Sequence, residues 1–410
     1  MPSGSAFHGW RVVAACFVIA AFAWALGLFG SSVYLQAVTA AHGWPIADVA
    51  AAITLFFVVS ALVQRSVGRG IDRWGPRPVL LSGAVLMALG VAAIGQVTAR
   101  WQLYPCFVLI GVGWSTLSTT GLTATVAPWF ERYQGRSMTL AIMGASIGAI
   151  VGVPALLLAV GKLGLASGLT MVGLVAAVVL LPLIARVLRF RRPEDIGQRR
   201  DGAAPIAEVA IVPQWPPTAT PENRHLLLWS AAAAFALALT VQIGFITHHV
   251  ALAAPALGTE GAGLLVSATG VAAFVGRLVL ARIVDRVDIR LLACGVMLAQ
   301  TSALLVLALV PSTVVLVGAS LVYGYGIGHV TTLGPVVVRR EFGATAFGAT
   351  YGTAATVIQL TSAFGPALFG VMRDGLGGYQ PGLAVASGIT LLGSSILYAG
   401  GRLARRAAKT

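Results

Sequence analysis

Charged residues are scarce in this chain: they make up 10% of its 410 residues, whereas 58% are hydrophobic. Soluble domains carry about a quarter charged residues, so a soluble globular protein is excluded. Apolar runs of about 20 residues, each long enough to cross ~30 Å of hydrocarbon as a helix, recur along the sequence and predict an all-α membrane protein with twelve transmembrane helices. The expected spans are 11–37, 47–66, 79–98, 102–127, 137–160, 166–188, 225–252, 262–280, 291–310, 312–338, 344–371 and 383–400.

Cysteines and acidic residues are also few. The 3 cysteines, Cys16, Cys106 and Cys294, each lie in an apolar span and lack a CxxC spacing, which excludes a disulfide framework or a zinc site. The 13 aspartates and glutamates fall in the connections and at the ends of spans. No paired carboxylates or nucleophile–base set is therefore expected at membrane depth, and we predict neither an enzyme nor a bound cofactor.

The 27 lysines and arginines are divided unequally between the two sides of the predicted membrane. With both termini in the cytoplasm, all but four lie in cytoplasmic connections and tails. Arg100, Lys162 and Arg373 lie outside, and Arg277 lies within a span. This is the positive-inside distribution of a protein of the cytoplasmic membrane. We attribute the net charge of +14 to topology and to contact with anionic membrane lipids, and we expect no nucleic-acid partner.

One long polar stretch, rich in proline, divides the apolar sequence into two parts. Because proline interrupts helices, this stretch is predicted to be a connection rather than a span. The sequence therefore predicts an N-terminal six-helix bundle at 1–189, a cytoplasmic linker at 190–223 and a C-terminal six-helix bundle at 224–410.

An internal repeat relates the two predicted bundles. The segment GRGIDR at 68–73 recurs as ARIVDR at 281–286. The same offset pairs Arg77 with Arg290 and Gln64 with Arg277. Two parallel, pseudo-symmetric six-helix halves with a substrate bound near the membrane midplane are typical of transporters that work by alternating access. Because Arg277 aligns with the neutral Gln64, the two halves are predicted to differ in charge at the membrane depth where the substrate binds.

Glycines spaced by four residues mark one face of two spans. They are Gly144, Gly148 and Gly152 in the fifth span, and Gly348 and Gly352 in the eleventh. Small residues in such a series let two helix backbones approach closely in lipid. We predict close helix contacts along both faces.

Arg277 is the only charged side chain predicted to lie deep within a span. A charge at that depth costs at least ~2.5–3.5 kcal/mol, so it normally has a functional partner. A guanidinium stays charged when desolvated and presents a planar fork that can donate two hydrogen bonds to a carboxylate. About seven residues, or roughly 10 Å of helix, separate it from the end of the span, which is a long reach for snorkelling. We predict that Arg277 binds the anionic group of a small substrate.

The segment GRGIDRWGPR at 68–77 matches the pattern G-x-x-x-D-R-x-G-x-R. This pattern is a signature of the major facilitator superfamily, which the chain resembles. An aspartate at the cytoplasmic end of a span can pair with an arginine and with a helix N-terminus, and so hold one conformation of the transporter. A purely structural ion pair is the alternative. The residues predicted to gate are Asp72, Arg73, Arg77, Asp285 and Arg286.

Four further segments narrow the resemblance. They are HGWRVV at 8–13, WFERYQGR at 129–136, HV at 249–250 and GR at 276–277. These segments resemble the monocarboxylate transporter family and its bacterial oxalate/formate antiporter relatives. The resemblance implies the twelve-helix facilitator fold, a bacterial inner membrane as location, and binding of a substrate carboxylate by the arginine of the eighth span.

Three positions depart from these families. Where the animal monocarboxylate transporters carry a coupling lysine in the first span, this chain has Leu28, and Ala273 replaces their acidic residue one turn before Arg277. The oxalate-type antiporters carry a second cation in the eleventh span, and 344–371 has none. One cation indicates a monoanion as the substrate rather than a dianion. The missing lysine and carboxylate leave open which group carries a coupled proton.

Histidines are candidates for this role, since imidazole titrates near neutral pH. His329 in the tenth span and His249 near the outer end of the seventh are predicted proton carriers, and the substrate carboxylate and bound water are the alternatives. Polar and aromatic side chains at mid-span would complete a binding pocket, although hydroxyl groups there also bond their own helix. The predicted substrate-binding residues are Arg277, Tyr325, His329, Tyr351, Leu28, Ser31, Thr120, Ser146 and Gln359.

The sequence thus predicts a secondary transporter that moves a small monocarboxylate, such as L-lactate or pyruvate, together with a proton, and that acts as a monomer. An exchanger of two organic anions is an alternative, and it would require internal substrate. An exporter of amphiphilic compounds would need no central arginine. A transporter-like receptor would bind without translocation and would carry a long soluble domain, whereas the longest polar stretch is 190–223.

Overall fold

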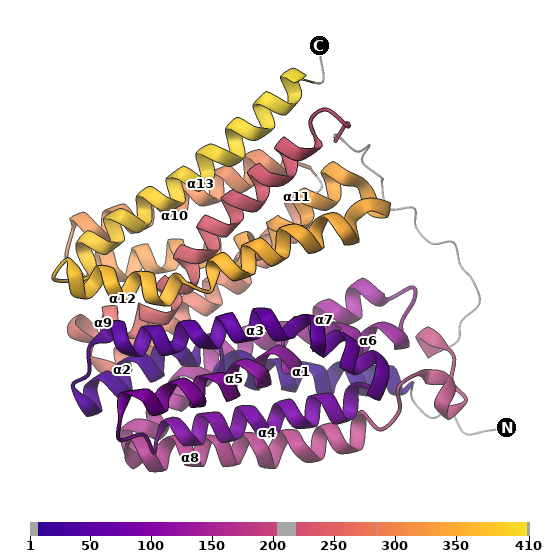
Figure 1. The fold of residues 1–410 in the computed structure, drawn as a ribbon, viewed down its shortest axis with the longest axis horizontal. Helices are drawn as coiled ribbons and strands as arrows, with labels where there is room; N and C mark the ends of the chain where they lie inside the picture. Colours follow the sequence, from indigo (N-terminus) through magenta and orange to yellow (C-terminus); the bar gives the residue numbers. More distant parts are fainter. Residues whose placement is uncertain (1–6, 203–218, 285, 408–410) are drawn as a thin grey trace. The chain divides into compact units, whose positions relative to one another are not determined.

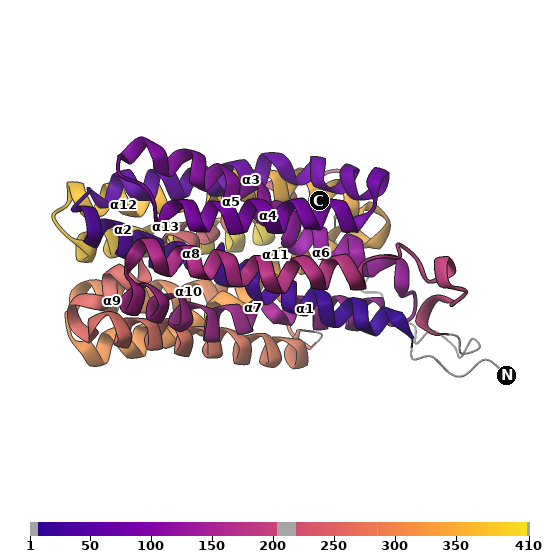
Figure 2. The same cartoon turned by 90° about the horizontal axis from the view of Figure 1, so that it is seen from below.

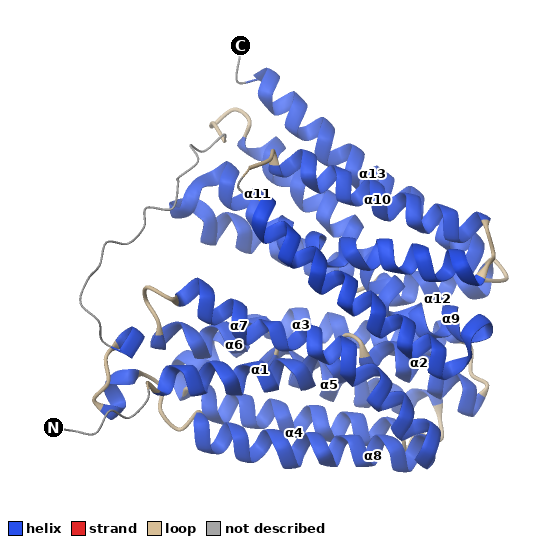
Figure 3. Cartoon of the chain, turned by 180° about the vertical axis from the view of Figure 1, so that it is seen from behind, coloured by secondary structure: helices blue, strands red, loops and turns tan. Residues whose placement is uncertain are grey.

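The computed structural model describes residues 7–202, 219–284 and 286–407, and every regular element in these ranges is helical (Figure 3). The chain divides into two compact units, one comprising residues 1–44 and 55–210 and the other 45–54 and 211–410. The domain boundaries at 189 and 224 stay a prediction.

The helices of the first unit follow one another along the sequence (Figure 1). They are α1 (His8–Leu26), α2 (Gly30–His42), α3 (Ile46–Trp74), α4 (Pro76–Ile94), α5 (Leu103–Leu117), α6 (Thr119–Val126), α7 (Gln134–Ile147) and α8 (Val153–Val187), with the start of α3 assigned to the second unit. The short elements are η1 (Arg100–Gln102), η2 (Ala127–Trp129), the π-helical turn η3 (Gly148–Gly152), η4 (Pro193–Ile196) and η5 (Arg200–Gly202). The second unit adds α9 (Arg224–Ile283), α10 (Ile289–Leu309), α11 (Thr313–Ser362), α12 (Gly365–Gly375) and α13 (Tyr379–Ala407).

Ten helical stretches of the described chain are long and apolar enough to cross a membrane. Two are too long for one crossing: Gln134–Val187 has 54 residues and Arg224–Ile283 has 60, which is roughly 80–90 Å of helix. Each is interrupted at a glycine with positive φ, 78° at Gly164 and 69° at Gly258, and the ψ values of 170° and 171° there are essentially restricted to glycine. Eight single and two double crossings confirm the predicted twelve transmembrane helices.

Glycine contacts organise the packing of the first unit. A Cβ atom at Gly144 would lie 1.9 Å from the carbonyl oxygen of Phe17, and one at Gly148 would lie 2.5 Å from that of Ala21. A Cβ atom at Gly152 would lie 2.3 Å from the Cβ atom of Ala25. The fifth span therefore packs directly on the backbone of α1, as its glycine spacing predicted. On the other side of the unit α4 lies beside α8 (Figures 1 and 2).

The glycine prediction for the eleventh span is wrong at the one position that can be compared. A Cβ atom at Gly352 would meet nothing within 4 Å. Gly348 lies outside the described side chains. Glycines spaced by four residues form a smooth helix face, but the spacing does not show whether another helix packs against that face.

The first span, expected to be one continuous helix, is interrupted between α1 and α2. A Cβ atom at Gly27 would lie 2.3 Å from the Trp114 ring, so the indole fills the space that a side chain would take. The Leu26 carbonyl at this break accepts a hydrogen bond of 2.8 Å from the hydroxyl of Tyr34. An aromatic ring from another helix therefore fills the space at an interruption that the even apolarity of the sequence does not show.

The fourth span is interrupted in a similar way. Ser118 is extended, with φ −89° and ψ −167°, and separates α5 from α6. A Cβ atom at Gly121 would lie only 1.7 Å from the carbonyl oxygen of Thr116, so the turn has room for glycine alone. Together with the π-helical turn η3, these two interruptions make the first unit the less regular of the two.

The second unit is built around contacts of α9 with α11 and α13. Buried apolar side chains from α9, α10, α11 and α13 form one core; they include Phe235, Met297, Leu333 and Leu397. The first turns of α3 also belong to this unit, since the backbone N–H of Ala47 donates to Asp374 of α12 at 2.8 Å. This core holds α9 and α11 together over the length that carries the candidate site.

Candidate functional site

Arg277 lies in the part of α9 that follows Gly258, and its side chain is half-buried. This part of α9 crosses α11 at glycines. A Cβ atom at Gly276 would lie 2.4 Å from the carbonyl oxygen of Tyr325, and one at Gly328 would lie 2.2 Å from that of Ala273. The Gly328 position is also 3.0 Å from the Cγ atom of Arg277. The missing side chains thus let the arginine lie directly against α11.

His329 lies at the same helix crossing as Arg277. A Cβ atom at Gly276, the residue before the arginine, would lie 3.0 Å from His329 Nδ1. That nitrogen is 2.9 Å from the carbonyl oxygen of Tyr325. Because a carbonyl only accepts, Nδ1 carries the hydrogen, and Nε2 is the acceptor of a neutral ring. The ring of Tyr325 packs on that of His329 at 4.8 Å. The structure thus brings together three of the predicted site residues.

We expect Gly328→Ala to impair substrate binding without touching the substrate. The added methyl group would collide with the Ala273 carbonyl and with Arg277 Cγ, so the two helices must separate and carry the guanidinium with them. A displacement of about 1 Å in a binding group costs on the order of 10- to 100-fold in function. Ligand-induced thermal stabilisation of the purified protein measures the effect.

Gly318→Ala is the matched control, because Gly318 lies in the same helix and a Cβ atom there would meet nothing within 4 Å. Its binding is expected to equal that of the wild type. Equal losses in the two variants would show that α11 tolerates no alanine, and that the crossing has no special role.

The two adjacent histidines of α9 face different partners. His248 Nδ1 lies 2.9 Å from the Tyr379 hydroxyl, and its Nε2 lies 3.0 Å from the Pro366 carbonyl. His249 Nε2 lies 3.1 Å from the Ser320 hydroxyl of α11, and its ring packs at 4.7 Å on Phe245. Both histidines are buried, at 1% and 2% exposure. His249, predicted as a proton carrier, therefore has a hydroxyl neighbour that the sequence did not indicate.

Predicted site residues of the first unit adjoin its helix interruptions. Leu28 lies between α1 and α2, and the Ser31 hydroxyl donates to the Leu28 carbonyl at 2.6 Å. Thr120 is the second residue of α6, and its hydroxyl accepts a hydrogen bond from the amide of Gln64, the repeat counterpart of Arg277. Ser146 is buried two residues before the π-helical turn η3. Such irregular turns are frequent at functional sites.

Two predicted residues of the eleventh span lie in other surroundings. Tyr351 packs against the apolar cluster of Leu227, Val338, Phe342 and Ala404. Gln359 is exposed near the end of α11. Among the described residues no three histidine, cysteine, aspartate or glutamate side chains are grouped to hold a metal ion.

A family model described as Major Facilitator Superfamily matches residues 13–366. The chain belongs to this superfamily. It is therefore a membrane transporter rather than an enzyme, and the predicted facilitator fold is confirmed.

Individual proteins are also similar to the chain. Monocarboxylate transporter 13 of Bos taurus is 26% identical over 408 residues, which cover 95% of this chain and 88% of that protein. The oxalate:formate antiporter of Oxalobacter formigenes is 27% identical over 148 residues, covering 36% and 35%. The solved structure of the nucleoside transporter NupG superposes with a TM-score of 0.72 at 13% identity over 96% of this chain and 98% of that chain, and shows the likeness of fold alone. The resemblance to monocarboxylate transporters is confirmed.

The signature of the major facilitator superfamily spans the junction of two helices, since α3 ends at Trp74 and α4 begins at Pro76. Asp72, Arg73 and Arg77 are exposed, and the Arg73 guanidinium lies 5.6 Å from the ring centre of Trp74. In the second unit Arg286 is exposed, and Asp285 lies outside the described residues. The gating role of these five residues stays a prediction.

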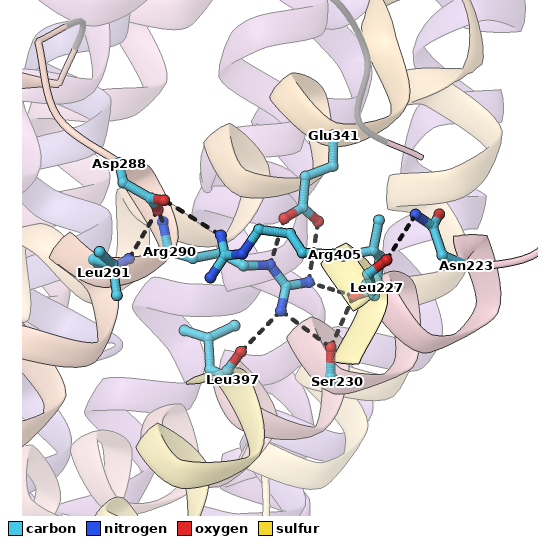
Figure 4. Close-up of polar contacts among 10 residues, drawn as sticks. Asn223, Leu227, Ser230, Asp288, Arg290, Leu291, Glu341, Leu397 and Arg405 are labelled. Carbon is cyan, nitrogen blue, oxygen red and sulfur yellow. Dashed lines mark hydrogen bonds and ion pairs between the residues drawn. The ribbon is translucent and has the colours of Figure 1, made fainter. Parts of the chain in front are cut away.

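Sequence reasoning missed a buried ion pair between Arg290 and Glu341 (Figure 4). The two residues are 4% and 6% exposed. Glu341 accepts hydrogen bonds from Nε and, at 3.1 Å, from a terminal nitrogen of Arg290. The guanidinium also donates to the Ser230 hydroxyl at 3.2 Å and to the carbonyls of Leu397 at 2.9 Å and Leu227 at 2.7 Å. The pair thus joins α9, α10, α11 and α13.

The signal for this pair was weak. The repeat aligns Arg290 with Arg77, which is exposed, so the sequence assigned Arg290 only to the positive-inside charge. A lone glutamate near the end of the tenth span was the available clue. Because all five N–H donors of Arg290 are used within the unit, the pair is structural and leaves no donor for a substrate.

Proposed function

We propose that this transporter is a symporter of small monocarboxylates, such as L-lactate or pyruvate, and that each anion crosses with one proton by alternating access. The observation that carries the proposal is the position of Arg277 against α11, at the crossing that also holds His329. A guanidinium there can bind a carboxylate through two hydrogen bonds. The relative from Bos taurus bears the name of a monocarboxylate transporter, which supports the same class of substrate.

Proton coupling follows from the energetics of charge movement. An unaccompanied anion would have to move against roughly 2.3 kcal/mol for each 100 mV of membrane potential. Together with one proton the anion crosses as a neutral complex. We further propose that the protein is a monomer in a bacterial inner membrane with both termini in the cytoplasm, as the positive-inside distribution supports.

Two measurements test this function. Thermal unfolding of the purified protein against a panel of mono- and dicarboxylates should show stabilisation by a monocarboxylate, since a ligand at 100 times its dissociation constant contributes roughly 2.7 kcal/mol. In proteoliposomes an outside-acid gradient should then drive uptake of that monocarboxylate without a compensating ion flux.

The rival function is exchange of two organic anions, which the similarity to the oxalate:formate antiporter favours. An exchanger would require substrate inside the vesicle and would ignore the pH gradient. Stabilisation by dicarboxylates combined with such exchange would contradict the proposed symport. Stabilisation by no carboxylate would contradict the substrate class as well.

A further inference from the structure

A polar seam runs between the first part of α9 and the first part of α11. It consists of Gln242 and His249 on α9 and of Ser320 and Tyr323 on α11, and each of these side chains is at most 2% exposed. Four polar side chains buried between two membrane-spanning helices are costly unless they are hydrogen-bonded. The seam therefore calls for a functional explanation.

Three members of the seam, His249, Ser320 and Tyr323, are neighbours. His249 Nε2 lies 3.1 Å from Ser320 Oγ. The ring of Phe245 packs on His249 at 4.7 Å and on Tyr323 at 4.4 Å, so these two side chains flank one aromatic ring. Gln242 lies one turn from Phe245 on the same face of α9. At 1.5 Å per residue the seam is about 10 Å long.

Two polar atoms of the seam have no partner within the part of the chain that the structure describes. The Tyr323 hydroxyl and the Gln242 carbonyl oxygen are buried, and neither has a hydrogen-bond partner among the described residues. Leaving such a group unsatisfied costs about 1–3 kcal/mol. Buried water commonly satisfies such groups in proteins, and it needs two to four polar partners. The seam offers a phenol, an amide, a serine hydroxyl and an imidazole as these partners.

We propose that the seam binds internal water and conducts the transported proton, with His249 as its carrier. This inference rests on the proposed proton coupling. A protonated water of the seam delivers its proton to a ring nitrogen of His249, so that one O–H bond breaks and one N–H bond forms. The reverse transfer, to water on the other side, later breaks an N–H bond of the ring and forms an O–H bond. The imidazolium charge balances that of the bound carboxylate.

His249 suits this role better than its neighbour. The Pro366 carbonyl can only accept, so it fixes the hydrogen of His248 on Nε2, and Nδ1 is taken by the Tyr379 hydroxyl. The Ser320 hydroxyl beside His249 can likewise donate or accept, so both protonation states of this ring keep a hydrogen bond. His249, unlike His248, also packs on the aromatic ring that contacts Tyr323, whose hydroxyl has no hydrogen-bond partner among the described residues.

The other titratable and charged groups lie away from His249. Tyr323 of α11 is the titratable group beside it, across the Phe245 ring. Arg373 and Asp374 of α12 and Tyr379 of α13 are grouped around His248 instead. On α10 the polar neighbour of Tyr323 is the neutral Gln300, whose amide donates to the Tyr323 carbonyl at 3.4 Å. Among the described residues no carboxylate or guanidinium contacts His249.

The seam leads toward the candidate substrate site. Tyr323 and His329 lie on the same helix, six residues or about 9 Å apart. His329 is at the crossing where Arg277 lies against α11. One helix therefore carries both the seam, on the side facing the first part of α9, and the anion site, on the side facing the second part. A proton on His249 and an anion at Arg277 can influence each other through α11.

Proteoliposomes separate proton movement from substrate movement. With L-lactate as the probe, His249→Gln is expected to reduce accumulation driven by an outside-acid gradient by roughly 10-fold or more, as removal of a proton-transfer group does. Exchange of lactate at equal pH and concentration on both sides needs no proton release, and it should be unchanged. His225→Gln is the control, because His225 is an exposed histidine of the same helix.

Tyr323→Phe tests the internal water independently of transport. Removing a hydroxyl that binds water lowers the midpoint of thermal unfolding, whereas removing an unsatisfied hydroxyl raises it. We expect a lower midpoint and slower gradient-driven uptake. A higher midpoint would overturn the water-binding part of the proposal.

The remaining outcomes are also decisive. Normal accumulation in His249→Gln, or loss of exchange together with accumulation, would overturn the role of the seam while the proposed function stands. A wild type that exchanges L-lactate but never accumulates it under the gradient would overturn the proposed coupling, and the seam proposal with it. A wild type that neither exchanges nor accumulates L-lactate would overturn both for this substrate.

Discussion

Arg277→Ala is expected to weaken strongly both the stabilisation by monocarboxylates and their uptake. Truncating one partner of a hydrogen-bonded charge pair in a desolvated site costs about 2–5 kcal/mol, so apparent affinity should fall roughly 30-fold or more. Arg277→Lys should retain part of the binding, because lysine keeps the charge but loses the planar fork. Titration of the unfolding midpoint against the preferred carboxylate measures all three proteins on one scale.

The control for this experiment is Arg282→Ala. Arg282 lies in the same helix, near its end, and its side chain is exposed. Its removal should leave affinity unchanged. If Arg277→Ala binds carboxylates as the wild type does, the substrate is not anchored by this arginine, and an uncharged or amphiphilic substrate becomes the leading hypothesis.

Glu341→Gln is expected to have the largest effect on stability. The substitution leaves the Arg290 guanidinium buried without its counter-charge, which typically costs 3–5 kcal/mol. Four helices meet at this pair, so the loss should appear as a lower unfolding midpoint and a lower yield of folded protein. The midpoint in detergent, without substrate, is the relevant measurement.

Two further variants are controls for the effect of Glu341→Gln. Glu194→Gln breaks an exposed pair with Arg200, whose atoms are 3.8 Å apart, and should change little because exposed ion pairs contribute ~0–1 kcal/mol. The double variant Arg290→Met with Glu341→Leu should be more stable than Glu341→Gln, since it removes both buried charges. A double variant that is less stable would show that the pair itself contributes net stability.

Much of the fold could be predicted from the sequence because crossing a bilayer constrains composition strongly. Each span must be apolar over about 20 residues, so the twelve spans were visible as separate runs. The glycines of the fifth span were predicted to pack closely, and Gly144 does so against Phe17. Arg277 could also be singled out from the sequence, because it is the only charged residue predicted to lie deep within a span.

The rest depends on contacts between distant residues. At the break at Gly27 the ring of Trp114 takes the adjacent space, and the sequence of the first span does not show that ring. The Arg290–Glu341 pair forms where four helices meet, so the sequence does not reveal it. Arg77, the repeat counterpart of Arg290, is exposed and gave no indication of a buried pair. His249 was a predicted proton carrier, but Ser320 and the unsatisfied Tyr323 hydroxyl became apparent only from packing.

The contact between α1 and the fifth span has a consequence for biosynthesis. Three other spans are made between these two partners, and Gly152 must be synthesised before α1 can complete its packing. At about 5–20 residues per second, the delay between Leu26 and Gly152 is roughly 6–25 s. During that time the first span remains in the insertion machinery or in lipid without its partner. The packing of α1 is therefore completed late, whereas the consecutive helices α4 and α5, which contact each other, can pair as soon as both are made.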